Sequence, residues 1–280
     1  MASIDGQIMI EFRSVTKKFE GTDSPAVDNF NQTIDSRTLH VFLGSSGCGK
    51  TTLLRMINRM ETPTEGTVLI DNANVADANP VELRRSIGYV MQSSGLLPHR
   101  TVLQNVTTVL RLQGKKKAQR RERGLEMMEL VGLDPNLADR YPTQLSGGQA
   151  QRVGVARALA PEPNIVLMDE PFAAVDPVVR RQLQDLTFNL QRELGTTIVF
   201  VTHDVDEALR LATRVVLLAE GAHIRAEGSP EEILANSDDQ FVDNFLGLHR
   251  GRQLQRKGDI VLDDVGRPLG RINGTEGDRA

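Results

Sequence analysis

The chain has 280 residues, 39% of them hydrophobic, which is enough to bury the core of one large domain or two small ones. Its formal net charge of −4 argues against binding nucleic acid through overall positive charge. The single cysteine, Cys48, cannot form an internal disulfide, so the sequence suits a reducing compartment. The first residues lack the basic end and apolar run of a secretion signal, and no stretch approaches the ~20 apolar residues that span a bilayer. We therefore expect the protein to remain inside the cell.

Short apolar, β-branched runs alternate with longer amphipathic segments from Leu39 onward. This alternation is typical of parallel strands joined by covering helices, so we expect an α/β fold with a mostly parallel sheet and flanking helices. Its strands are expected near residues 39–43, 87–91, 164–168, 197–201 and 214–218. Alternating runs joined by short polar turns predict an additional antiparallel edge layer near residues 9–15, 26–34 and 66–70.

Between Thr101 and Ala160 the apolar residues fall at helical spacing, which predicts a helical subdomain inserted at about residues 98–160. This segment contains the charged run KKKAQRRER at residues 115–123. No aromatic residue interleaves the run, so a solvated helix face is favoured over a contact with nucleic acid.

The end of the chain changes character. Ser229-Pro-Glu-Glu232 has the pattern of a capping box that opens a short helix. We expect the α/β domain to occupy residues 1–250 and residues 251–280 to form a short, mobile tail. Within this tail, the segment 258–272 has the composition of one isolated hairpin.

The segment from Gly44 to Thr51 fits G-x-x-x-x-G-K-[ST] and lies between a buried strand and an amphipathic helix. Its backbone amides and the helix N-terminus can surround phosphate oxygens, Lys50 can reach the outer phosphates, and Thr51 can ligate Mg²⁺. The alternative, a chance glycine turn, is disfavoured by the strand and helix on either side. The predicted nucleotide contacts are Gly44, Ser45, Ser46, Gly47, Cys48, Gly49, Lys50, Thr51 and Thr52.

Two adjacent acids, Asp169 and Glu170, follow the buried strand IVLM. Acids at the carboxyl end of a strand face the ligand crevice of an open α/β sheet, so Asp169 is a candidate Mg²⁺ ligand. Because successive strand residues point to opposite sides, Glu170 is expected to orient and deprotonate the attacking water. The alternative is a solvated acidic turn before Pro171. His203 ends another apolar strand and is expected to contact the γ-phosphate at the same edge.

The pentamer Leu145-Ser146-Gly147-Gly148-Gln149 opens a helix and resembles the signature sequence of ABC ATPases. In that family each nucleotide is held between the phosphate loop of one subunit and the signature loop of another. The resemblance therefore implies a head-to-tail dimer of two copies, with ATP and Mg²⁺ at the interface and Ser146, Gly147, Gly148 and Gln149 contacting the nucleotide.

The same resemblance assigns three more residues. Phe19 matches the aromatic that stacks on adenine, Gln92 matches the glutamine that contacts Mg²⁺ and the water, and Asp176 matches an aspartate at the dimer interface. The chain departs from the usual family pattern at two places. Most members have a tyrosine at the position of Phe19, and most have Ser-Ala-Leu-Asp where this chain has Ala173-Ala174-Val175-Asp176.

Three kinds of ABC protein compete: a transporter subunit, a soluble ATPase of translation, and a DNA-maintenance ATPase. The sequence has one cassette and lacks sustained heptads between Lys50 and Ser146, which disfavours the other two kinds. An exporter half commonly fuses its membrane domain to the cassette, and the sequence has no spanning segment, so we expect a separate importer subunit. Such a subunit would bind membrane permease subunits and act indirectly with a solute-binding protein, and we expect no nucleic-acid partner. It would lie at the cytoplasmic face of the membrane as a peripheral protein. The runs QSSGLLPHRTVLQNV and DDQFVDNFLGLHRG resemble the branch that takes up osmoprotectants such as glycine betaine, choline and carnitine. Importers of amino acids or sulfonates, and a soluble non-transport ABC ATPase, remain alternatives.

Overall fold

The computed structural model describes residues 8–173, 175–235, 239–247, 255–262 and 268–271. The chain divides into two compact units, residues 1–233 and 234–280, and each is described by itself. The division that we predict from the sequence, with an α/β domain to residue 250 and a helical subdomain at about 98–160, stays a prediction.

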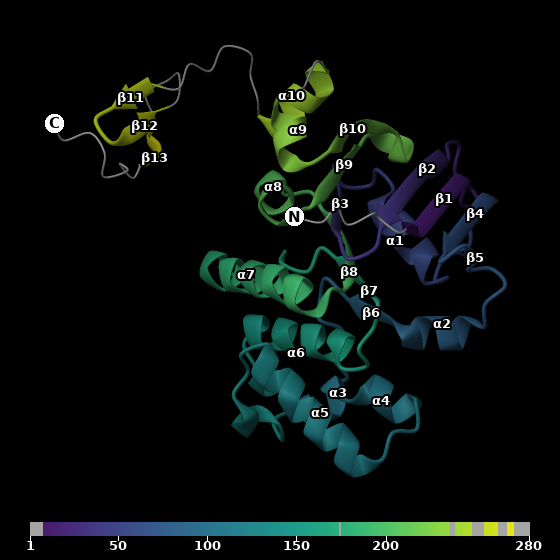
Figure 1. Ribbon diagram of the computed structural model, residues 1–280, viewed down its shortest axis with the longest axis vertical. Helices are drawn as coiled ribbons and strands as arrows, with labels where there is room; N and C mark the ends of the chain where they lie inside the picture. Colours follow the sequence, from purple (N-terminus) through teal and green to yellow (C-terminus); the bar gives the residue numbers. More distant parts are fainter. Residues whose placement is uncertain (1–7, 174, 236–238, 248–254, 263–267, 272–280) are drawn as a thin grey trace, which may run out of the picture. The chain divides into compact units, whose positions relative to one another are not determined.

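The first unit contains two sheets among its described residues (Figure 1). The smaller sheet is antiparallel with the order β2-β1-β4-β5, and its strands are β1 (Ile8–Lys17), β2 (Val27–Asp35), β4 (Glu65–Ile70) and β5 (Ala73–Asn74). The larger sheet has the order β10-β9-β3-β8-β7-β6, with β3 (Leu39–Gly44), β6 (Ile87–Val90), β7 (Ile165–Asp169), β8 (Thr197–Thr202), β9 (Arg214–Leu218) and β10 (Ile224–Gly228). All of its neighbouring strands pair in parallel except β10, which pairs antiparallel with β9. The predicted α/β fold is confirmed.

The strands β3 and β8 lie in the middle of the larger sheet, and every residue of both is buried. Their sequences, LHVFLG and TIVFVT, are mostly apolar on both faces, as a strand covered on both sides requires, and TIVFVT is rich in β-branched residues. Parallel pairing brings the carboxyl ends of β3, β8, β7 and β6 to one edge of the sheet. This edge carries the candidate functional residues.

The main core lies between the two sheets and around α1 (Lys50–Ile57), which lies between the sheets in Figure 1. One face of α1 buries Leu53, Leu54, Met56 and Ile57. Phe12, Phe30 and Phe42, from β1, β2 and β3, pack edge to face with ring centroids 5.2 to 6.4 Å apart. These contacts fix the antiparallel sheet against the parallel sheet.

Helices dominate the segment between β6 and β7. It contains α3 (Val102–Val106), α4 (Thr108–Leu112), α5 (Lys117–Leu130) and α6 (Gly147–Leu159). Figure 1 shows these helices grouped beside α7 (Pro177–Leu194), and α6 is in contact with α3, α5, α7 and β6. The remaining α-helices described in the first unit are α2 (Pro80–Ser86), α8 (Val205–Leu211) and most of α9 (Pro230–Ala235), which runs across the boundary between the units. Among the same described residues, three short 3-10 helices lie at Pro135–Leu137, Pro142–Gln144 and Glu220–Ala222.

The predicted capping box is present at the start of α9. The Ser229 amide donates to Glu232 Oε2 at 2.8 Å, and the Glu232 amide donates to Ser229 Oγ at 3.2 Å. The second unit contains α10 (Gln240–Leu246) and a three-stranded antiparallel sheet of β11 (Gln255–Lys257), β12 (Ile260–Leu262) and β13 (Pro268–Arg271). The pairing of β12 with β13 matches the hairpin expected from the sequence, and β11 adds a strand that we did not predict. Among the described residues, no helix is long and apolar enough to span a bilayer.

His40 is the second residue of β3 and is almost fully buried, and its Nε2 atom has no hydrogen-bond partner. Burial, and secondarily the positive charge of Arg214 on β9, lower the pKa of His40 to about 3. The native protein therefore binds fewer protons here than the unfolded chain. This contribution to stability is fully present above the ordinary histidine pKa of about 6.5 and is lost progressively as the pH falls from there toward 3.

We predict that His40→Leu removes this pH dependence. Between pH 7 and pH 5, His40 alone should lower the free energy of unfolding of the wild type by about 2 kcal/mol, and the variant should lack this loss. Urea unfolding at the two pH values measures it, with His99→Gln, at an exposed position, as the control. An equal pH dependence in wild type and His40→Leu would contradict the buried, neutral state of this side chain.

Candidate functional site

The segment between β3 and α1 turns in a way that only glycine permits at two positions. Gly49 has φ of +109°, and a Cβ atom there would lie 2.5 Å from the carbonyl oxygen of Ala26. A Cβ atom on Gly44 would lie 2.5 Å from the carbonyl oxygen of Leu218. These close approaches let the loop fold tightly over the start of α1. Ser45, Ser46 and Gly47 remain exposed at its tip.

Lys50 is the first residue of α1, and it is buried. Its Nζ atom donates to the carbonyl oxygens of Gly44 and Ser45 at 2.8 and 2.7 Å. A buried ammonium group needs such partners, since an isolated charge in the interior is very unfavourable. The loop therefore holds one positive charge beside the N-terminus of a helix, an arrangement suited to phosphate oxygens.

Cys48 in the same loop is buried, and burial raises the pKa of its thiol. A protonated, buried thiol is a poor nucleophile. The contribution of Cys48 to a ligand is therefore limited to its backbone.

Asp169 ends β7 next to the loop. Thr51 Oγ1 donates to Asp169 Oδ1 at 2.9 Å, so the structure brings the two predicted metal ligands into direct contact. Tyr89 Oη donates to the other carboxylate oxygen, Oδ2, at 3.2 Å, and Arg55 Nη2 lies 3.9 Å from it. Burial, and then the charge of Asp169, raise the pKa of Tyr89 to about 12, so the phenol keeps the proton that it donates.

Sequence reasoning missed Tyr89 and Arg55. A signal for Tyr89 was present, because it lies on β6, the neighbour of β7, two residues before the end of the expected strand. Arg55 lies on α1 one helical turn after Thr51, so both side chains lie on one face of the helix.

Glu170 follows Asp169 with φ of +44°, a left-handed conformation that is uncommon for a residue other than glycine. We expected strand alternation to separate the two acids, but β7 ends at Asp169 and the left-handed turn redirects the chain. The Glu170 amide donates to the Val201 carbonyl of β8 at 3.1 Å, which anchors the turn. Such strain persists where the surrounding structure enforces it, often at functional sites.

The Glu170 carboxylate has two side-chain neighbours. Gln92 Nε2 donates to Oε2 at 3.3 Å, and His203 Nδ1 lies 3.2 Å from Oε1. The carboxylate is 19% exposed, whereas the His203 side chain is 58% exposed. Three residues that are widely separated in sequence thus meet beside Asp169, in an arrangement that can hold a water molecule near a general base.

The turn that carries His203 is fixed by the end of β8. Thr202 Oγ1 donates to Glu207 Oε2 at 2.7 Å and accepts from the Asp204 amide at 3.0 Å. Burial raises the pKa of Glu207, which is nearly inaccessible to solvent. Asp204 caps α8 by accepting from the Glu207 amide. These bonds hold the backbone on both sides of His203.

The segment expected to be the second phosphate contact lies at the start of α6. Ser146 caps the helix, since its Oγ accepts from the Gln149 amide at 3.2 Å while Gln149 Oε1 accepts from the Ser146 amide at 2.9 Å. Ser146 and Gly147 are exposed, and Gly148 is buried where a Cβ atom would lie 2.4 Å from Val179 Cγ1. The first-turn amides of such a helix have no partners within the helix.

Within the described residues, no hydrogen bond or ion pair connects the segment 146–149 to the phosphate loop of the same chain. Phe19 is 37% exposed, and Lys17 Nζ lies 5.0 Å from the centroid of its ring. Asp176 caps α7 by accepting from the amides of Val178 and Val179 at 3.1 Å. The structure thus brings together Lys50, Thr51, Asp169, Glu170, Gln92 and His203, and leaves Phe19, Asp176 and Ser146 to Gln149 outside that network.

The donor set fits a hard cation only in part. Among the described residues, no group of three or more His, Cys, Asp or Glu side chains could hold a metal ion. Thr51 and Asp169 offer two oxygen ligands in contact with each other. Mg²⁺ is commonly held by one or two protein oxygens together with substrate phosphates and water, so this pair fits such an ion when a phosphate ligand is bound.

The parallel sheet, the glycine loop after β3 and the acid at the end of β7 define the fold of a P-loop NTPase. A family model described as "ABC transporter" matches residues 27–173. The glycine betaine uptake system ATP-binding protein YehX of Escherichia coli is 46% identical over 239 residues, which cover 85% of this chain and 77% of that protein. The chain belongs to the ABC transporter family, as its sequence resemblance predicted.

Two further relatives are longer than this chain. The choline transport ATP-binding protein OpuBA of Bacillus subtilis is 49% identical over 242 residues, and the carnitine transport ATP-binding protein OpuCA of Listeria monocytogenes is 46% identical over 253 residues. These matches cover 86% and 90% of this chain, but 63% of each relative. The chain thus spans less than two thirds of the length of these two proteins.

Solved structures share the fold. The ATP-binding cassette MJ0796, in a dimeric structure bound to ADP and Pi, matches with a TM-score of 0.73 and 37% identity over 79% of this chain and 99% of that chain. The cbiO1 protein of Clostridium perfringens matches with a TM-score of 0.74 and 28% identity over 87% of this chain and 96% of that chain.

Proposed function

We propose that this protein is the ATP-hydrolysing subunit of an ABC importer, and that it powers the uptake of quaternary-amine osmoprotectants through separate membrane subunits. The proposal rests on one observation: Gln92 and His203 both contact Glu170, next to the Thr51–Asp169 pair and the buried Lys50. It supports nucleotide hydrolysis. The names of the choline, carnitine and glycine betaine transport relatives support the solute class.

The phosphate loop binds the nucleotide phosphates. The Gly44 to Thr52 segment surrounds them with backbone amides, and Lys50 exchanges a carbonyl partner for a phosphate oxygen, which gives a charge-assisted hydrogen bond. Phe19 stacks on adenine. Thr51, Asp169 and Gln92 would hold Mg²⁺, which would neutralise the charge that develops on the transferring phosphoryl group.

Glu170 is the general base. It accepts the proton of a water molecule that Gln92 orients, and the water oxygen forms a bond to the γ-phosphorus while the bond to the β-phosphate bridging oxygen breaks. His203 donates to the γ-phosphate oxygens and, through its contact with Glu170, keeps the carboxylate in place. The products are ADP and inorganic phosphate.

The active unit contains two copies of the chain. Ser146 to Gln149 of one copy approach the γ-phosphate held by the loop of the other copy, and Asp176 lies at the interface between them. The dimeric structure of MJ0796 supports this arrangement. ATP draws the two copies together, and hydrolysis loosens them. This closure and opening of the dimer moves the membrane subunits, which the two copies contact at the cytoplasmic face.

The function is tested by reconstituting the protein with its membrane subunits and solute-binding protein. We predict that glycine betaine, choline or carnitine increases ATP hydrolysis, whereas the same complex with Glu170→Gln loses at least about 100-fold in turnover because the general base is absent. Stimulation by an amino acid or a sulfonate alone would reject the solute class. Turnover of Glu170→Gln at the wild-type rate would reject the catalytic assignment.

Tyr89 is proposed as a positioning residue for Asp169. Tyr89→Phe removes the hydrogen bond to Asp169 Oδ2 and lets the carboxylate rotate away from Thr51. We predict a roughly 3- to 10-fold higher Mg²⁺ concentration for half-maximal ATP hydrolysis, as expected for a loss of about 1 kcal/mol, with little change in turnover at saturating Mg²⁺. Tyr141→Phe, at an exposed position, is the control. An unchanged Mg²⁺ requirement would show that the phenol does not position the acid.

A further inference from the structure

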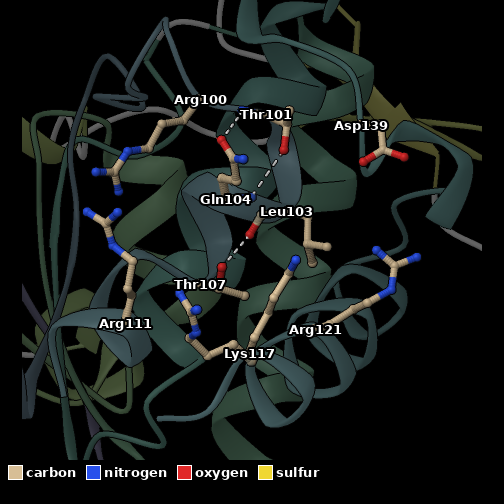
Figure 2. A pocket seen from close by; sticks show the side chains of 10 residues that line it. Arg100, Thr101, Leu103, Gln104, Thr107, Arg111, Lys117, Arg121 and Asp139 are labelled. Carbon is tan, nitrogen blue, oxygen red and sulfur yellow. Dashed lines mark hydrogen bonds between the residues drawn. The ribbon is translucent and has the colours of Figure 1, made fainter. Parts of the chain in front are cut away.

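A cavity of about 490 Å³ opens between α3, α4 and the start of α5, away from the residues assigned to nucleotide hydrolysis. Five of its lining side chains are cationic and only one is acidic: Arg100, Arg111, Lys117, Arg120, Arg121 and Asp139. Figure 2 shows Arg100 and Arg111 along one side, Lys117 reaching toward the middle, and Arg121 and Asp139 on the other side. The cavity therefore has a formal excess of four positive charges.

These cations come from three separate segments. Arg100 precedes α3, Arg111 lies on α4, and the others lie on the first turns of α5. Lys117, Arg120 and Arg121 have the spacing i, i+3, i+4, which places them on one face of α5. The charged run at 115–123 is thus more than a solvated helix face, because part of it lines a concave surface.

The positive charges are not neutralised within the described part of the chain. Asp139 has no basic nitrogen within 4 Å, and none of the five cations has an ion-pair partner there. Arg100 Nη1 donates to the Thr108 hydroxyl at 3.3 Å, which leaves its charge uncompensated. The positive charges of these side chains repel one another, and a bound anion would relieve the repulsion.

The start of α5 adds to this imbalance. An α-helix has a partial positive charge at its N-terminus, where acidic residues are favourable, yet the first turn of α5 contains none and begins with Lys117. In addition, Arg120 Nε is buried and has no hydrogen-bond partner in the structure. A buried donor without a partner is unfavourable, so this part of the lining is incompletely satisfied within the described residues.

The lining also indicates the chemistry of the ligand. It contains no aromatic ring on which a base could stack, and Leu103 is its one aliphatic side chain among the described lining residues. Guanidinium groups bind phosphate oxygens in a bidentate geometry, and several of them around one cavity favour an anion with more than one charge. The volume lies within the range of small-ligand sites.

We propose that this cavity binds a phosphate-bearing anion with two or more negative charges, at a site separate from the nucleotide site. The anion is either a small molecule in solution or the phosphomonoester headgroup of a lipid, since both present the same chemistry. The proposal does not depend on the proposed transport function, because none of the cavity residues takes part in nucleotide hydrolysis.

Pyrophosphate binding tests the proposal in full-length protein carrying Lys50→Ala, which removes the phosphate-loop lysine as a competing contact. Titration calorimetry at low salt should detect the binding of pyrophosphate to this protein. The additional pair Arg111→Gln and Lys117→Gln should weaken binding by at least about tenfold, because two charge-assisted contacts are lost. Both side chains are exposed, so the fold should tolerate the changes.

A matched pair, Lys115→Gln and Arg181→Gln, makes the same change in net charge at exposed positions outside the cavity, and it should leave the affinity within about twofold. Asp139→Asn removes the one acidic side chain among the described lining residues and should increase the affinity for pyrophosphate. A damaged fold would not increase the affinity. Equal losses in both pairs, or no effect of Asp139→Asn, would overturn the proposal.

Vesicles distinguish the two sources of the anion. Phosphatidylcholine vesicles with and without phosphatidic acid are compared with pyrophosphate, again with both pairs of variants. Binding to phosphatidic acid that only the cavity pair weakens identifies a lipid headgroup, whereas pyrophosphate binding without vesicle binding identifies a soluble anion. Absence of binding to both probes would overturn the proposal.

Discussion

Parallel pairing of β3, β8, β7 and β6 places the ends of four strands at one edge of the sheet, and the candidate site depends on this constraint. The loop after β3 carries Lys50 and Thr51, β7 ends in Asp169, and the residues that follow β6 and β8 contact Glu170 from either side. No single segment contains enough of these groups for catalysis. Their spacing is set by the sheet, whose central strands are buried on both faces.

The proposed chemistry uses two separate sets of residues of one chain. The network around Lys50 and Glu170 has the groups to bind phosphates and activate water, whereas the start of α6 offers an exposed, capped helix N-terminus that makes no described bond to that network. A second copy can supply the missing helix to each nucleotide. In the proposed function the nucleotide completes the contact between the two copies, so this division would let ATP control their association.

Sequence patterns predicted the strands of the parallel sheet, the phosphate loop and the capping box at Ser229, because each depends on local periodicity or on a short motif. Family resemblance assigned Gln92. The patterns did not predict the left-handed turn at Glu170 or the hydrogen bond from Tyr89 to Asp169, because these depend on backbone conformation or on contacts between distant segments. The cationic cavity was missed for the same reason, since Arg100 and Arg111 join Lys117 only in the folded chain. The strand β11 pairs with the adjacent β12, so it was missed although its contacts are local.

In the proposed mechanism, one nucleotide bridges two copies of the chain. Sedimentation of Glu170→Gln with and without ATP tests it most directly, in the isolated protein and with the membrane subunits present, because this variant should bind ATP without hydrolysing it. We predict an ATP-dependent dimer that disappears when Ser146→Arg places a bulky side chain at the start of α6, while ATP binding to the phosphate loop persists. A Glu170→Gln protein that shows no ATP-dependent dimer in either setting, or a double variant that still dimerises, would contradict it.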